Sequence, residues 1–400
     1  MASSYLILFS LLLATSAHVP APRYKLRKVL IFSRHAIRTP VATALNEITP
    51  KCWPQFEEEP GYLTAKGAMV EGQMGVFFSE WLQKEGLLTG DCPDESMFYA
   101  YANIKQRTKA SARAFVEHAF PGCNVTVHHK NKYPDPVFAP ILHNTSEAFK
   151  EAAVISMKGR LHALKLTDAL NDLSSILDFN DSKKCLEDHE CDFALDKNKI
   201  SIDKDKTSVK GPLKYGNEAV DAFVMAYFQG FPTEEVAWGS MSSERWRELI
   251  RIMRGYHDVV FNDTAIAKDI SKNLIQYIKT RLLNKSSAVT LLMGHDANFY
   301  TFLPTLGIKY YELKDQLENI PPGGKIVFQK WYDVIEEKEL LKINFVYQSS
   351  HQLRKGSKLS LAHPPRSILL EINGCEVDSK GFCPWEDFAR ALNAIEFNSS

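Results

Sequence analysis

The sequence predicts an α/β protein: a three-layer core with a central, mostly parallel sheet flanked by helices, plus an inserted, mainly α-helical cap domain. Three observations lead to this prediction. Short apolar runs typical of buried strands alternate with helical patterns early in the chain. The middle of the chain is mostly helical in pattern and has few such runs. Finally, 400 residues are enough for two domains.

The predicted strands are short runs of apolar, β-branched and aromatic residues. They cover Lys28–Ser33, Met97–Ala102, Ala288–Gly294, Lys325–Tyr332, Lys342–Gln348 and Ser367–Ile372. A helical pattern separates the first two, because Val70, Met74 and Phe77 recur at the spacing of one helix face. A second helical pattern ends near Phe120. Strands that alternate with helices predict an α/β sheet.

The cap prediction depends on the middle of the chain. Residues 146–176 have a helical pattern rich in Ala, Leu and Lys, and residues 178–210 are polar and charged. Two further helical patterns follow this polar section. We therefore expect a core of residues 24–143 and 262–400 and a helical cap of residues 144–261.

Composition excludes two classes of partner. The chain has 48 basic and 48 acidic residues, so its formal net charge is zero. A neutral protein lacks the electrostatic footprint that nucleic acid or an anionic membrane requires. We therefore expect neither partner, and we expect any local cluster of positive charge to serve a specific ligand.

The first residues predict a secretory signal peptide, residues 1–17. The apolar run from Tyr5 to Ala14 is too short to span a bilayer, and small residues follow it. The alternative is a buried N-terminal helix. Together with the signal peptide, six glycosylation sequons predict a secreted glycoprotein: Asn124, Asn144, Asn180, Asn262, Asn284 and Asn398.

Seven cysteines fit an oxidising compartment. Cys185 lies close to Cys191 in the sequence, and Cys375 lies close to Cys383, so each pair can form a local disulfide. The number is odd, so at least one cysteine is unpaired or pairs between chains. Zinc is the competing interpretation, but the chain has no CxxC motif or Cys/His cluster.

The stretch "LIFSRHAIRTP", residues 30–40, places Arg34, His35 and Arg38 directly after a buried strand. Ligands of α/β sheets bind beyond the carboxyl ends of the strands. Two guanidinium groups suit a phosphate, which accepts planar bidentate donors. The imidazole between them is positioned as a nucleophile or general base. The alternative is a solvated loop with incidental charges.

Two further strand ends carry polar groups that fit the same chemistry. The run "LLMGHD" ends in His295 and Asp296, and Arg107 follows the strand predicted at Met97–Ala102. Beside a bound dianionic phosphate the pKa of Asp296 should rise, which would make it a proton donor. The alternatives are a helix-capping Asp296 and a solvated Arg107. Taken together, the three strand ends predict a phosphate site with a nucleophile and an acid.

At this point the sequence resembles a known family. The pattern R-H-x-x-R-x-P, a mid-chain Arg and a late H-D is that of the histidine acid phosphatases, the two-domain branch of the histidine phosphatase superfamily. "LTAKG" at Leu63 to Gly67 matches the family's L-T-x-x-G. The resemblance extends over nearly the whole mature chain and is greatest to the glucose-1-phosphatase subgroup. Segments that carry it include "FYAYANIKQRT", "AFPGCNVTVHH", "GPLKYGNEAVDAF" and "GGKIVFQKWYD".

The resemblance implies a role for each candidate residue. His35 would be the nucleophile that forms a phosphohistidine, and Asp296 would protonate the leaving oxygen and then help to activate water. The phosphate-binding residues would be Arg34, Arg38, Arg107 and His295. The implied disulfides are Cys92–Cys123, Cys185–Cys191 and Cys375–Cys383, which leaves Cys52 unpaired. Neither a metal nor another cofactor is implied, because the arginines supply the positive charge.

The sequence departs from the family's pattern at a few positions. Ala36 replaces the usual Gly after the nucleophilic His, which makes the phytase-like subgroups less favoured. Cys52 has no clear counterpart. The basic stretch "DKDKTSVK" contains Lys204, Lys206 and Lys210. If one of these lysines reaches the pocket, substrates with several phosphates become plausible; otherwise the stretch is a solvated loop.

We therefore predict a secreted acid phosphatase that hydrolyses phosphomonoesters, small sugar phosphates such as glucose 1-phosphate in particular. The small-molecule substrate is the partner we expect, and a homodimer is a further option. One alternative is a phytase or inositol polyphosphate phosphatase. Another is a secreted phosphate-ligand or effector protein without turnover, although binding alone needs neither His35 nor Asp296. A mutase is a third, but the family's mutases lack a signal peptide because they are cytosolic.

Overall fold

The structure is a computed structural model that describes residues 22–41 and 45–397. The predicted signal peptide, residues 1–17, and the sequon at Asn398 lie outside the described residues. Among the described helices, none has the length and apolar character needed to cross a membrane.

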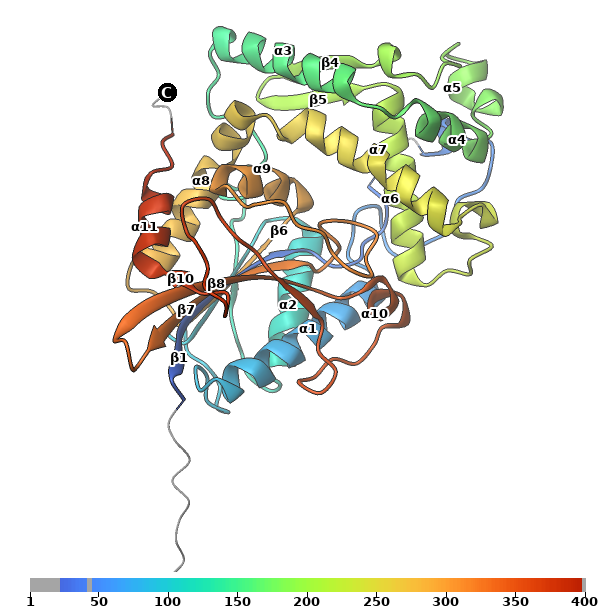
Figure 1. Cartoon of the computed structure of the whole chain (residues 1–400). Coiled ribbons are helices and arrows are strands. Elements are labelled where there is room, and N and C mark those ends of the chain that lie inside the picture. Colours follow the sequence, from blue (N-terminus) through green and yellow to red (C-terminus); the bar gives the residue numbers. More distant parts are fainter. Residues whose placement is uncertain (1–21, 42–44, 398–400) are drawn as a thin grey trace, which may run out of the picture.

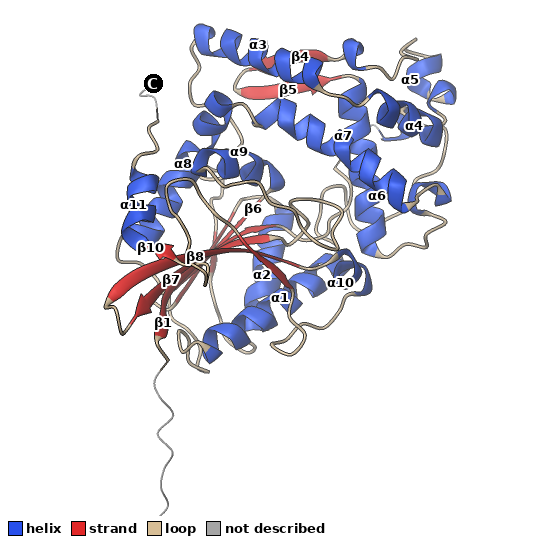
Figure 2. Cartoon of the chain, in the orientation of Figure 1, coloured by secondary structure: helices blue, strands red, loops and turns tan. Residues whose placement is uncertain are grey.

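An eight-stranded mixed sheet forms the centre of the molecule (Figures 1 and 2). Its order is β10-β8-β7-β1-β6-β2-β3, and β9 pairs with β8. The strands are β1 (Tyr24–Arg34), β2 (Phe98–Ala102), β3 (Val127–His128), β6 (Val289–Gly294), β7 (Lys325–Asp333), β8 (Lys338–Tyr347), β9 (Arg366–Leu369) and β10 (Cys383–Pro384). Strands β1, β6, β2 and β3 pair in parallel, whereas β7 to β10 pair antiparallel with their neighbours. Five of the eight, β8 included, run in one direction.

Alternate residues of the central strand face the two helical layers. Leu30 and Phe32 pack against apolar side chains of α8 (Thr264–Leu283), α9 (Asp296–Leu306) and α11 (Trp385–Asn393). Val29 and Ile31 point the other way, toward α1 (Ala65–Lys84) and α2 (Gln106–Ala119). This alternation follows from the two-residue period of a strand. The predicted three-layer α/β core is confirmed (Figure 1).

The segment from Asn144 to Phe261 forms a mainly helical unit that lies beside the central sheet (Figure 1). Its elements are α3 (Glu147–Ala163), α4 (Thr167–Leu177), α5 (Lys183–Leu186), β4 (Lys199–Asp203), β5 (Lys206–Lys210), α6 (Pro212–Gln229) and α7 (Ser243–Phe261). Leu173, Phe223 and Ile252 from three of its helices belong to one buried apolar cluster. We call this segment the cap.

The β4–β5 hairpin within the cap is a feature that the sequence patterns did not predict (Figure 2). Its strands have five residues each, and only Val209 among them is buried. Since the other side chains are half-buried or exposed, the segment has no apolar run of the kind that identifies a buried strand.

The cap is joined to the core by polar contacts as well as by packing. Arg354 at the end of α10 (Ser350–Lys355) donates to the carbonyl oxygens of Tyr227 at 2.6 Å and Phe231 at 2.8 Å. Lys66 on α1 donates to the carbonyl oxygen of Gln229 at 3.1 Å. These contacts fix the end of α6 against the core.

Three disulfides are present, and they are the pairs that the family resemblance implies: Cys92–Cys123, Cys185–Cys191 and Cys375–Cys383. Cys52 is free and exposed in the described part of the chain.

Candidate active site

The two histidine motifs lie side by side because their strands are neighbours. Strand β1 pairs in parallel with β6, and Arg34 is opposite Gly294. The amide of His35 donates to the carbonyl oxygen of Gly294 at 3.0 Å, so His295 begins on the same edge of the sheet. The His35 and His295 rings meet edge to face, with their centroids 5.4 Å apart. Parallel pairing thus brings together two motifs that are 260 residues apart in the sequence.

His35 is buried and is held in one tautomer. Its Nδ1 lies 2.9 Å from the carbonyl oxygen of Ala36. A carbonyl can only accept, so Nδ1 carries the proton and Nε2 carries the free lone pair of the neutral ring. Burial and then the positive charge of Arg107 hold the pKa of His35 well below 6.5. A neutral imidazole with a bare Nε2 is a competent nucleophile.

Arg34 is fully buried and faces two carboxylates. Its Nη1 donates to Glu318 Oε2 at 2.8 Å and also to the carbonyl oxygen of Ile320. Its Nη2 lies 3.0 Å from Asp296 Oδ2. The guanidinium is therefore fixed on one side by Glu318 and faces Asp296 on the other.

Arg38 connects the core to the cap. Its two terminal nitrogens make a bidentate pair with Asp221 on α6, each at 2.9 Å. Nη1 also donates to the carbonyl oxygen of Thr39 at 3.1 Å, and Nε is the nitrogen that has no partner among the described residues. Asp221 belongs to the cap, so the position of a core phosphate-binding candidate depends on a cap residue.

Arg107 and His295 complete the group of side chains around His35. Burial and then the charge of Arg107 lower the pKa of His295, so its imidazole is neutral in the free protein. Arg107 lies in the first turn of α2, and its burial, with Arg38 nearby, lowers its pKa to about 10. His295 Nε2 lies 2.9 Å from Asn103 Oδ1, which also accepts from the backbone amide of Lys105. Asn103 therefore fixes the ring and leaves Nδ1 facing the site.

Five buried nitrogen atoms of these residues lack a hydrogen-bond partner in the described part of the protein. They are Arg34 Nε, Arg34 Nη2, Arg38 Nε, Arg107 Nε and His295 Nδ1, and Arg34 Nη2 has only its ion-pair contact with Asp296. Buried polar atoms without partners are rare in folded proteins and need an explanation. Three guanidinium groups and an imidazole fit a tetrahedral oxyanion such as phosphate.

Asp296 occupies the first position of α9, directly after His295. Burial alone would raise its pKa, but the positive charge of Arg34 holds the pKa well below 3.8. The sequence-based expectation of a raised pKa applies to the phosphate-bound state. In the free protein Asp296 is an anion paired with Arg34.

A cavity of about 280 Å³ opens above these groups, between core and cap. Arg38 and Asp296 line it on the core side. The cap contributes oxygen acceptors and a histidine, namely Asn217, Glu218, Asp221 and His257. Burial, with Asp221 nearby, raises the pKa of Glu218. The side facing the cap is therefore rich in acceptors and carries no Lys or Arg of its own.

The three lysines of the basic stretch do not line this cavity. Lys204, Lys206 and Lys210 are exposed on the β4–β5 hairpin. Lys206 lies over the ring of Tyr133 at 5.2 Å, and Lys210 lies 3.6 Å from Asp203. The alternative of a solvated charged segment is the one that the structure supports.

The "LTAKG" motif packs helix α1 against the loop after His35. Thr64 caps α1 by accepting from the amide of Gly67 at 2.9 Å, and its own amide donates to the carbonyl oxygen of Ile37 at 3.1 Å. A Cβ on Gly67 would lie 2.0 Å from that oxygen, so only glycine allows this approach. The motif therefore positions the backbone two residues beyond His35.

Comparison with known proteins identifies the family. A glucose-1-phosphatase of Salmonella typhimurium is 40% identical to this chain over 391 residues, which cover 95% of each sequence. The chain belongs to the histidine acid phosphatase family. A glucose-1-phosphatase of Providencia rettgeri is 39% identical, covering 92% of this chain and 91% of the relative. Among solved structures, the apo phytase of Hafnia alvei has a TM-score of 0.83 at 29% identity, covering 94% of this chain and 98% of that one. No protein-family model matches the chain.

The six site residues that the sequence predicts in this acid phosphatase lie close together at one edge of the sheet. They are Arg34, His35, Arg38, Arg107, His295 and Asp296. Sequence reasoning missed the acidic and amide partners that orient them, namely Asn103, Asp221 and Glu318. Asn103 directly follows a predicted strand, so its place at the sheet edge was available as a signal. Asp221 and Glu318 have no local signal, because they are 183 and 284 residues away from the arginines they bind.

A buried ion pair lies next to the site and does not line it. Lys325 Nζ lies 2.6 Å from Glu71 Oε1, and both side chains are fully buried. Lys325 also donates to Ser33 Oγ at 2.8 Å and to the carbonyl oxygen of Gly323 at 3.1 Å. The amide of Gly323 in turn donates to the carbonyl oxygen of His35 at 3.0 Å. The pair therefore supports the backbone that carries the nucleophile candidate.

Proposed function

We propose that this acid phosphatase hydrolyses glucose 1-phosphate and related sugar monophosphates through a phosphohistidine at His35. The observation that carries the proposal is the free Nε2 of a neutral His35, set among three guanidinium groups and the His295 imidazole, whose buried nitrogens lack partners. A protein that only binds phosphate would need the guanidinium groups but not the nucleophile, so the free Nε2 of His35 is the feature that favours turnover.

In the first step His35 Nε2 attacks the phosphorus atom while the bond from phosphorus to the sugar oxygen breaks. Arg34, Arg38 and Arg107 would neutralise the charge on the three other phosphate oxygens. The departing oxygen needs a proton, which Asp296 supplies. Because the dianionic phosphate brings negative charge next to Asp296 and competes for Arg34, it raises the pKa of Asp296 from its low value in the free protein.

In the second step a water molecule attacks the phosphohistidine. Asp296, now an anion, takes one proton from that water, and the bond from phosphorus to Nε2 breaks. Inorganic phosphate then leaves, and Nε2 regains its lone pair. An acidic pH optimum follows, because the first step needs Asp296 in its protonated form.

The cap side of the cavity supports a sugar monophosphate. Glu218 and Asp221 are carboxylates, and Asn217 Oδ1 has no partner among the described residues. Such oxygens accept hydrogen bonds from the hydroxyl groups of a sugar. No Lys or Arg of the cap lines the cavity to bind the additional phosphates of inositol hexakisphosphate, and Lys214, 3.4 Å from Glu218, is paired with that carboxylate. The phytase alternative is therefore less favoured.

Two measurements test the proposal. Initial rates at pH 4 to 6 should be higher on glucose 1-phosphate than on inositol hexakisphosphate, and the reverse order would favour the phytase alternative. The His35→Ala variant should release no phosphate from a generic aryl phosphate. Substantial residual turnover by that variant would refute the role of His35.

The secreted location is part of the proposal as well. It rests on the N-terminal pattern of residues 1–17 and is supported by the three disulfides, which persist in oxidising compartments. Expression in a eukaryotic secretory host should yield a mature chain that begins after residue 17 and carries N-glycans. Retention of an unprocessed chain in the cytosol would contradict it.

A further inference from the structure

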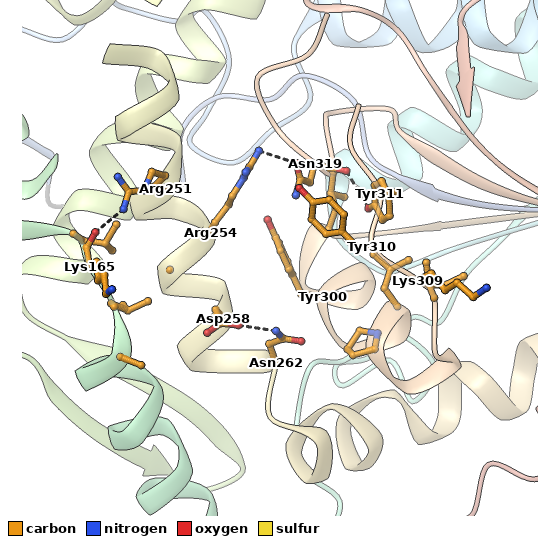
Figure 3. Close-up of a pocket in the computed structure, with 18 residues that line it drawn as sticks. Lys165, Arg251, Arg254, Asp258, Asn262, Tyr300, Lys309, Tyr310, Tyr311 and Asn319 are labelled. Carbon is orange, nitrogen blue, oxygen red and sulfur yellow. Dashed lines mark hydrogen bonds between the residues drawn. The ribbon is translucent and has the colours of Figure 1, made fainter. Parts of the chain in front are cut away.

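A second cavity, separate from the candidate active site, opens on the other side of α7 (Figure 3). Its volume is about 590 Å³, against about 280 Å³ for the candidate active site, and the two share no lining residue. Its walls are α7 and the turn after α3 on the cap side, and α9 with residues 308–320 on the core side. This volume lies in the range of small-molecule sites. We call it the α7–α9 cleft.

Positive charge predominates in the α7–α9 cleft. It is lined by four cationic side chains and a single carboxylate, that of Asp258. Arg251 and Lys309 are paired with acidic residues, and Asp258 is paired with Arg160. Within the described chain, the two remaining cations, Lys165 and Arg254, have no carboxylate partner.

Arg254 has unused donors that face the cleft. Its Nη2 donates to Asn319 Oδ1 at 2.7 Å, across the cleft from the cap to the core (Figure 3). A guanidinium has five N–H donors, so most of them remain available to a ligand. Since Asn319 is an amide, the charge of Arg254 is not neutralised by this contact.

Flat aromatic rings form the opposite wall. Tyr300 projects into the middle of the cleft, and Tyr310 and Tyr311 lie beside it (Figure 3). The Tyr300 hydroxyl makes no hydrogen bond with the described residues. Burial raises the pKa of Tyr300, so its hydroxyl stays protonated and can donate to an anion. Leu303 and Ile308 add apolar surface next to these rings.

A pair of stacked rings connects the cleft to the candidate active site. The Tyr300 ring stacks on His257 with a centroid distance of 4.2 Å and an interplanar angle of 8°. His257 lines the candidate active site with Asp296. Tyr300 and Asp296 also lie on the same helix, α9, one turn apart. A ligand on Tyr300 would therefore contact the element that positions Asp296.

We propose that the α7–α9 cleft is a binding site for a small aromatic anion, distinct from the phosphate site. The aromatic body would pack on Tyr300 and the neighbouring apolar side chains, and the anionic group would bind Arg254, while Lys165 adds to the positive charge of the cleft. Two uncompensated cations beside exposed rings fit this chemistry better than they fit a neutral or cationic ligand. The proposal does not depend on the function proposed above.

Equilibrium dialysis with naphthalene-2-sulfonate tests the site. The full chain is used in inorganic phosphate at a concentration that abolishes hydrolysis of an aryl phosphate, so that the active site is occupied. We expect one saturable site per chain. Methanesulfonate, which lacks the ring, and 2-naphthol, which lacks the charge, should each bind at least tenfold more weakly.

Variants locate the binding. Arg254→Met should weaken naphthalene-2-sulfonate binding at least tenfold, because a charge-assisted hydrogen bond is lost. Lys165→Met should weaken it less, because Lys165 contributes only longer-range positive charge. Arg247→Met is the matched control, because Arg247 lies on the same helix, is largely exposed and does not line the cleft. Unfolding temperatures of all three variants verify that they are folded.

Three results would overturn the proposal. One is the absence of saturable binding to the wild-type chain. Another is equal binding by Arg254→Met and Arg247→Met, which would place the probe elsewhere on the surface. The third is displacement of the probe by phosphate in proportion to the inhibition of turnover, which would place it in the active site.

Discussion

Arg34 Nη2 lies 3.0 Å from Asp296 Oδ2, so the arginine that ends the central strand is paired with the carboxylate that begins α9. Arg34 is fully buried, whereas the Asp296 side chain is 23% exposed and borders the cavity. The pair keeps Asp296 ionised in the free protein. A phosphate that binds Arg34 must weaken this pair, and that exchange would link substrate binding to the protonation of Asp296.

If Asp296 is the proton donor, the activity lost on its substitution should depend on the leaving group of the substrate. In the Asp296→Asn variant, kcat on glucose 1-phosphate should fall by about 100-fold or more, because the sugar oxygen leaves as a poor alkoxide without a proton donor. On 4-nitrophenyl phosphate the loss should be much smaller, since that phenolate leaves without a proton. Steady-state kinetics on both substrates provide the measurement. An equal loss on both would exclude Asp296 as the acid.

The buried neutral state of His35 predicts a pH dependence of stability. Burial lowers the pKa of His35 in the folded protein, whereas in the unfolded chain it is about 6.5. Below pH 6.5 the unfolded state therefore binds more protons, and the free energy of unfolding falls as the pH falls. Well above pH 6.5 both states hold a neutral His35, and its contribution to the free energy of unfolding no longer changes with pH.

Urea unfolding in phosphate-free buffer at pH 7.5 and 5.5 measures this contribution. Between the two pH values wild type should lose about 1 kcal/mol more than the His35→Asn variant, since one pH unit on one titrating group is worth about 1.4 kcal/mol. His351→Gln is the control, because His351 is exposed. Equal losses for wild type and His35→Asn would show that His35 is not held neutral.

The acidic cap side of the cavity predicts a change in substrate preference. Removal of the Glu218 carboxylate should raise the rate on inositol hexakisphosphate relative to glucose 1-phosphate by about tenfold, because the carboxylate is lost and Lys214, 3.4 Å from it, becomes free to attract the additional phosphates. Relative kcat/KM values of Glu218→Ala test this. Glu187→Ala, an exposed change in the cap, serves as the control. An unchanged ratio would mean that Glu218 does not select the substrate.

Two helical glycines should respond in opposite directions to alanine. A Cβ at Gly67 would lie 2.0 Å from the carbonyl oxygen of Ile37, whereas a Cβ at Gly159 would meet nothing within 4 Å. Gly67→Ala should destabilise by about 1–3 kcal/mol and lower kcat, because it displaces the loop after His35. Gly159→Ala should stabilise by roughly 0.5–1 kcal/mol. The unfolding temperatures of both variants test these two predictions. Stabilisation by Gly67→Ala would contradict the close approach of Gly67 to the carbonyl oxygen of Ile37.

The buried Lys325–Glu71 pair predicts a strong asymmetry between single and double variants. Lys325→Met should destabilise by about 3–5 kcal/mol, because it leaves the Glu71 carboxylate buried without its partner. The double variant Glu71→Leu/Lys325→Met should regain much of that stability, since neither charge remains. A double variant less stable than Lys325→Met, by urea unfolding, would contradict this account.

Local patterns in the sequence were sufficient to place the chemistry at strand ends. The second half of β1 and most of β6 are apolar, Arg34 ends β1, and His35, His295 and Asp296 directly follow the two strands. The rule that parallel strands end at one sheet edge then predicts that these side chains meet. This prediction used the two strand ends alone and did not depend on the structure of the cap.

Features that depend on long-range or weak local signals were not predictable. The β4–β5 hairpin has mostly half-buried or exposed side chains, and β3 and β10 contain only two residues each. The partners of the arginines, Glu318 and Asp221, are brought in by the tertiary fold alone. The low pKa of Asp296 in the free protein likewise follows from its contact with Arg34, which no sequence pattern reveals.

The most direct test of the central claim is to trap the covalent intermediate. The enzyme is mixed with glucose 1-phosphate, quenched within milliseconds in alkali, which preserves phosphohistidine, and digested for mass spectrometry. We predict one phosphoryl group on the peptide that contains His35, lost on brief acid treatment and absent from the His35→Ala variant. A phosphoryl group on another residue, or turnover with no phosphorylated peptide, would contradict the account.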